Sequence, residues 1–131
     1  MTNFEFSEVQ NGNFKGLSQK ANLVAGALAI LATYHISRVF FPEATLGIRS
    51  ESTYVMSAII PDIFGLIAAI YFVGAAKLYR AIVKTQGTDI HLLILGNEKI
   101  RQAIKCLSIA IFLYSARLVL MGLLFKAVLE S

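Results

Sequence analysis

The chain has 131 residues, of which 56 % are hydrophobic and 15 % are charged, and its net charge is +4. Soluble domains carry a charge on about a quarter of their residues, so this composition excludes an ordinary soluble globular protein and indicates a membrane protein. A chain this short has no room for a membrane bundle and a separate aqueous domain, so we expect a single transmembrane helical domain over residues 1–131.

The N-terminal lead, residues 1–16, is polar and contains Glu5 and Glu8. This acidic character differs from the basic start of a signal peptide, so the apolar segment that follows is expected to remain in the mature chain. That segment has no charged residue over positions 21–37. It predicts a first transmembrane helix over about residues 20–41.

The second apolar segment, residues 52–76, contains Asp62 as its one charged residue and predicts a helix over about residues 54–84. Proline is favoured in the first turn of a helix and kinks a helix elsewhere. Two starts therefore fit the pattern: a start at about Ser52, which places the proline inside the helix, or a start at Pro61 itself. The sequence does not choose between them.

The third apolar segment, residues 106–125, contains only Arg117 as a charged residue and lies within a predicted helix over about residues 98–128. Before it, residues 88–95 form a short apolar run that the dipeptide Gly96-Asn97 separates from the long helix, which predicts a short interfacial helix. The predicted fold class is therefore all-α: an integral membrane protein with three transmembrane helices and a short interfacial helix between the second and the third.

Basic residues are divided unevenly between the two ends of the predicted helices. Most lie on the side of the N-terminus and of the connection between the second and third helices. By the positive-inside rule, the N-terminus is expected in the cytoplasm and the C-terminus outside, in a membrane such as the bacterial inner membrane. The residues on the predicted cytoplasmic side are Lys15, Lys20, Lys77, Arg80, Lys84, Lys99, Arg101 and Lys105, and those on the opposite side are Arg38, Arg49 and Lys126.

Four ionisable residues within or near the spans are the candidate site residues: His35, Arg38, Asp62 and Arg117. Such groups are costly in hydrocarbon, so each is expected to face protein or water. One interpretation is a polar cluster in the outer leaflet, in which Asp62 pairs with Arg117 or Arg38. His35 titrates near neutral pH in such a cluster. The alternative is structural: Asp62 occupies the first turn of a helix that begins at Pro61, and His35 and Arg38 reach the headgroups.

Small residues recur at helical spacing and predict close helix packing, either within the chain or between subunits. Ser108, Ser115 and Gly122 repeat every seven residues along the third helix. The tyrosines, Tyr114 among them, are interpreted as residues of the aromatic belt and the core. The predicted packing residues are Ala25, Ala29, Gly65, Ala69, Ser115 and Gly122.

No hydrolase, nucleotide or dinucleotide motif occurs, so neither enzymatic activity nor a cofactor is expected. Cys106 is the single cysteine and no set of metal ligands is apparent, so no metal is expected. The basic residues flank the apolar segments rather than form one exposed patch, so nucleic acid is not expected as a partner.

The expected function is association within the lipid bilayer, as an accessory subunit of a larger membrane complex or as a homo-oligomer. The alternative is an oligomeric channel, a holin-like pore or a proton-linked transporter with a polar path through Arg117, Asp62 and His35. A membrane enzyme that acts on lipid, with Asp62 or His35 as the base, ranks behind both because no nucleophile and base stand at a recognisable spacing.

Overall fold

The structure is a computed structural model that describes residues 6–40, 52–84 and 89–129. Within these ranges, the side chains of residues 38–39, 52–58, 124–125 and 128–129 lie outside the described part. The regular secondary structure of the described residues is α-helical throughout and consists of α1 (Glu8–Phe40), α2 (Ser52–Ile82) and α3 (Asp89–Leu129).

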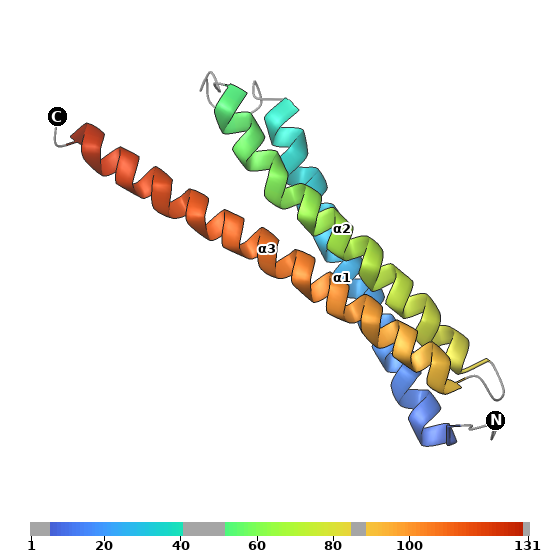
Figure 1. The fold of residues 1–131 in the computed structure, drawn as a ribbon. Coiled ribbons are helices and arrows are strands. Elements are labelled where there is room, and N and C mark those ends of the chain that lie inside the picture. Colours follow the sequence, from blue (N-terminus) through green and yellow to red (C-terminus); the bar gives the residue numbers. More distant parts are fainter. Residues whose placement is uncertain (1–5, 41–51, 85–88, 130–131) are drawn as a thin grey trace.

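The central helix is α2, which packs against both α1 and α3 (Figure 1). Among the described residues, the backbones of α1 and α3 make no close contact with each other. Figure 1 shows α1 and α2 running alongside each other, whereas the C-terminal half of α3 diverges from both. The molecule is therefore an open arrangement organised by α2 rather than a closed three-helix bundle.

The core between the helices is built mainly from alanine, which lets helix backbones approach closely. Next to it, the buried Ser18 hydroxyl of α1 donates a hydrogen bond of 2.9 Å to the Ala76 carbonyl of α2. A second cluster, built from larger side chains, surrounds Tyr79 and Ile82 near the end of α2. The buried residues of the alanine-rich cluster are Ala21, Ala25, Ala69, Phe72, Ala76 and Ala103.

Two of the helices are long and apolar enough to cross a membrane. The segments are Ile59–Ile82 in α2 and Asp89–Leu123 in α3, and the most apolar 18 residues of each have a mean hydropathy of 2.0. These helices agree with the predicted membrane character and with the all-α fold class. A third span, in α1, remains a prediction, because α1 is not among the helices that meet this criterion over the described residues.

The first helix begins earlier than predicted, at Glu8 rather than near residue 20. Ser7 and Gln10 explain this start, because they form a capping box. The Ser7 hydroxyl accepts a hydrogen bond of 3.4 Å from the Gln10 backbone N–H, and the Gln10 side chain accepts one of 2.8 Å from the Ser7 backbone N–H. Residues 8–16, predicted to be a polar lead without helix, are therefore part of α1.

The second helix begins at Ser52, so Pro61 lies inside α2. The earlier of the two possible starts is thus the observed one. Proline has no backbone N–H, so α2 lacks one helical hydrogen bond at this level. The structural alternative, in which Asp62 sits in the first turn of a helix that begins at Pro61, is wrong.

The predicted interfacial helix does not form as a separate element, because α3 runs without a break from Asp89 to Leu129. Gly96 continues the helix and provides a contact point with α2. A Cβ at Gly96 would lie 2.8 Å from Cε1 of Tyr79, so only glycine permits this approach. The Tyr79 hydroxyl also donates a hydrogen bond of 2.7 Å to the Asn97 side-chain oxygen. Gly96-Asn97, which was expected to separate two helices, instead lies within α3, and both residues contact Tyr79 of α2.

The substitution Gly96→Ala is expected to lower the free energy of unfolding by about 1–3 kcal/mol, because the buried Tyr79 ring must shift to admit a methyl group. The measurement is equilibrium unfolding in detergent, followed by circular dichroism. Gly26→Ala in α1 is the matched control, since a Cβ there meets nothing within 4 Å. Equal stability of the two variants would contradict the proposed role of Gly96.

Candidate functional site

Three polar side chains, one from each helix, meet between α1, α2 and α3. His35 comes from α1, Asp62 from α2 and Tyr114 from α3. The Tyr114 hydroxyl donates a hydrogen bond to Oδ1 of Asp62. Nδ1 of His35 lies 3.2 Å from the same oxygen and 2.5 Å from the Tyr114 hydroxyl. These residues form what we call the His–Asp–Tyr site.

The contacts of the site indicate one tautomer of His35. Because the Tyr114 proton is directed at Asp62, the Nδ1 proton of His35 is the donor to Oδ1 of Asp62 and to the Tyr114 oxygen. Within the described part of the chain, the hydrogen bonds of His35 all use Nδ1, and its side chain is 35 % exposed. The imidazole therefore contacts the buried Asp62 carboxylate through Nδ1, and its Nε2 makes no hydrogen bond with a described residue.

Asp62 is the buried centre of the site, with 3 % of its surface exposed. Oδ1 accepts both hydrogen bonds, whereas Oδ2 has no hydrogen-bond partner among the described residues. A cavity of about 110 Å³ lies next to it, with Asp62 and Tyr114 as its polar lining residues. Its remaining lining residues are Leu28, Leu31, Ala32, Pro61, Gly65, Leu107, Ala110 and Ile111.

Two neighbours in α2 shape this cavity. Pro61 precedes Asp62 and Gly65 follows one turn later, and both are buried and line the cavity. A Cβ at Gly65 would meet nothing within 4 Å, so the missing side chain leaves space beside the carboxylate. A volume of about 110 Å³ has room for water. The local sequence of α2 thus places a carboxylate beside a small, mostly apolar chamber.

The structure brings two of the four candidate site residues, His35 and Asp62, into direct contact. The sequence suggests pairing of Asp62 with Arg117 or Arg38, whereas its observed hydrogen-bond partners are His35 and Tyr114. Arg117 lies about one turn beyond Tyr114 on α3. Arg38 belongs to α1, but its side chain lies outside the described part.

The predicted packing residues differ in how far they are buried. Ala25 and Ala69 are buried in the alanine-rich cluster, and Gly65 lines the cavity. Ala29 is partly buried. Ser115 and Gly122, both on α3, are exposed.

Tyr114 is the site residue that sequence reasoning missed, because it was interpreted as a residue of the belt or core. Its position three residues before Arg117 is the one available signal, since residues three apart share a helix face. That spacing does not say which residue of α2 stands opposite Tyr114. The register between two helices depends on their packing.

Comparisons with protein-family models, curated proteins and solved structures find no match to this chain. Among the described residues, no group of three or more His, Cys, Asp or Glu side chains is arranged to hold a metal ion.

The substitution Tyr114→Phe is expected to lower the free energy of unfolding by about 1.5–3 kcal/mol, because it removes a hydrogen bond to a buried carboxylate. Tyr71→Phe is the matched control, since the Tyr71 ring lies under Lys99 and its hydroxyl makes no hydrogen bond with a described residue. Thermal unfolding of both variants in the same detergent measures the difference. If Tyr114→Phe is as stable as the control, the hydrogen bond from Tyr114 to Asp62 does not stabilise the fold.

Proposed function

We propose that this protein is an integral membrane protein with three transmembrane helices that acts by self-association through α3. α2 and α3 are long and apolar enough to span a bilayer. α1 packs along α2, and its 21–37 segment carries no charge, so in a bilayer α1 shares the hydrocarbon with α2. Its side chains Leu23 and Ile30, each 73 % exposed, suit contact with lipid.

The observation that carries the proposal is the poor burial of α3. In the most apolar 18 residues of α3, 6 % of the residues are buried, whereas in those of α2 44 % are buried. The C-terminal half of α3 diverges from the other helices (Figure 1). Ser108, Ser115 and Gly122 are all exposed, so the row of small residues on α3 does not pack within the described part of the chain. We call this row the α3 small-residue face.

The occupant that fits this face best is a second copy of the chain. A seven-residue repeat keeps the small residues on one side of two helices that cross at a shallow angle. Two copies inserted in the same orientation present the same row at the same depth, which makes the face self-complementary about a two-fold axis. A helix of a different subunit is the other occupant that the test distinguishes.

Disulfide crosslinking in native membranes tests this association. In a Cys106→Ala background, Ser115→Cys and Gly122→Cys are expected to give a covalent dimer on mild oxidation, because the two rows face each other. Leu120→Cys is the matched control: Leu120 is 61 % exposed and lies on the opposite side of α3. Mass spectrometry of the crosslinked bands identifies the partner.

A crosslink to a different polypeptide would replace self-association by a role as accessory subunit. No crosslink at either position, together with a monomer in native mass spectrometry, would contradict association altogether.

The His–Asp–Tyr site favours a second candidate function, proton-linked transport. The groups that contact Asp62 are His35 from α1 and Tyr114 from α3. His35 is partly exposed and Asp62 is buried, so a proton that passes between them moves from an accessible to an enclosed group. Buried ionisable groups within membrane segments commonly serve such relays. The cavity that Asp62 lines provides room for water at the carboxylate.

Proton flux into liposomes that contain the protein and a pH-sensitive dye tests this candidate. Asp62→Asn is expected to reduce the flux to the level of empty liposomes, because an amide cannot exchange a proton with His35. Glu98→Gln is the matched control, since Glu98 pairs with Arg101 on the surface of α3. Flux that is absent from the parent protein, or equal in both variants, would exclude this role of the site.

A further inference from the structure

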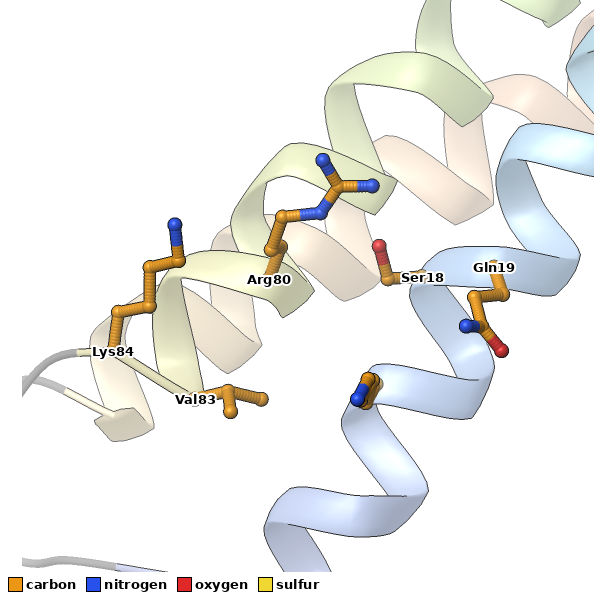
Figure 2. Close-up of a pocket in the computed structure, with 6 residues that line it drawn as sticks. Ser18, Gln19, Arg80, Val83 and Lys84 are labelled. Carbon is orange, nitrogen blue, oxygen red and sulfur yellow. The ribbon is translucent and has the colours of Figure 1, made fainter.

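A basic cleft lies between α1 and α2 at the end of the molecule where α2 terminates. Its volume is about 390 Å³. Figure 2 shows Arg80, Val83 and Lys84 projecting from α2 beside Ser18 and Gln19 of α1. Lys15 of α1 completes the lining. We call these six residues the basic cleft.

The charge of the cleft is entirely positive. Lys15, Arg80 and Lys84 line it and no carboxylate does. In the part of the chain that the structure describes, none of these three cations forms an ion pair. Like charges that converge on one cavity repel each other, and an anion between them removes that repulsion. The cleft is therefore electrostatically suited to an anionic ligand.

The donors of the cleft match the oxygens of a phosphate. The Arg80 guanidinium offers a planar fork that bonds two phosphate oxygens at once, and the lysines add mobile positive charge. The Gln19 amide adds a neutral donor. The Ser18 hydroxyl is already directed at the Ala76 carbonyl, so it ties α1 to α2 and keeps the cleft walls in place.

The position of the cleft along the helices indicates the depth in the membrane at which a phosphate binds. Arg80, Val83 and Lys84 stand where the apolar segment Ile59–Ile82 ends. Lys15 precedes the uncharged 21–37 segment of α1. In a bilayer, this level is that of the lipid headgroups, and Val83 supplies an apolar wall beside the charges. Basic pockets between membrane helices at this depth bind anionic headgroups.

We propose that the basic cleft binds a phosphate group through Arg80, Lys15 and Lys84. The phosphate is carried by an anionic phospholipid or by a free anion, and the lipid source rests on the membrane location proposed above. Neither self-association nor the His–Asp–Tyr site requires this binding.

The experiment compares the parent with two triple variants of equal charge change. Lys15→Gln, Arg80→Gln and Lys84→Gln together neutralise the cleft. Lys20→Gln, Arg101→Gln and Lys105→Gln together are the control, since these three exposed cations lie outside it. Each protein is inserted into vesicles of mixed phosphatidylglycerol and phosphatidylcholine, and native mass spectrometry records the retained lipid. A second arm measures the thermal stabilisation by inorganic phosphate against chloride at equal ionic strength.

The cleft variant is expected to lose phosphatidylglycerol retention or phosphate stabilisation by at least about tenfold in apparent affinity, which is about 1.4 kcal/mol. The control is expected to retain both. Loss in the lipid arm identifies a headgroup as the source, and loss in the phosphate arm alone identifies a free anion. Equal behaviour of the two triple variants in both arms overturns the proposal.

A single substitution distinguishes a loss of binding from a folding defect. Arg80→Lys keeps the charge but removes the guanidinium fork, and it is expected to weaken binding less than the triple variant while the helix content by circular dichroism stays that of the parent. Wild-type affinity in Arg80→Lys together with unchanged binding in a correctly folded triple variant overturns the assignment. Failure of every protein to insert into vesicles would contradict the membrane location, and the phosphate arm would still test the cleft.

Discussion

A carboxylate buried within an apolar helix sets the arrangement of this molecule. Asp62 is 3 % exposed, so its hydrogen bonds must come from other parts of the protein. His35 supplies one from α1 and Tyr114 supplies the other from α3. The backbones of these two outer helices do not touch over the described residues, so these hydrogen bonds join α1 and α3 through α2.

Polar and apolar contacts have different roles around α2. The alanine-rich cluster, in which Phe72 is the one large buried side chain, brings the helix backbones close to α2 with little loss of side-chain entropy. Specific polar contacts then fix the position of each neighbour along α2: Ser18 bonds the Ala76 carbonyl, and Tyr79 bonds Asn97. The basic cleft and the His–Asp–Tyr site lie at two levels of the same α1–α2 pair, and each depends on this register.

Hydropathy predicts the all-α fold and the three apolar segments, because both follow from local composition. The start of α1 was predicted about twelve residues too late, although Ser7 and Gln10 stand at capping-box spacing. The continuity of α3 through Gly96 was not readable, because it depends on where the Tyr79 ring of α2 lies. The same limit applies to the site: burial cost marks Asp62 as a residue that needs partners, but the choice among them is made by the packing of three helices.

Because α3 diverges from α1 and α2, a small change in its tilt moves its C-terminal end by a larger distance. The helix is held to α2 at Gly96 and Asn97 and is fixed again at Tyr114. From Tyr114 to the helix end at Leu129 the rise is ~22 Å. A rotation of about 10° around Tyr114 displaces that end by ~4 Å on this rise. A tilt of the C-terminal part of α3 about Tyr114 is therefore small at the His–Asp–Tyr site and large at Leu129.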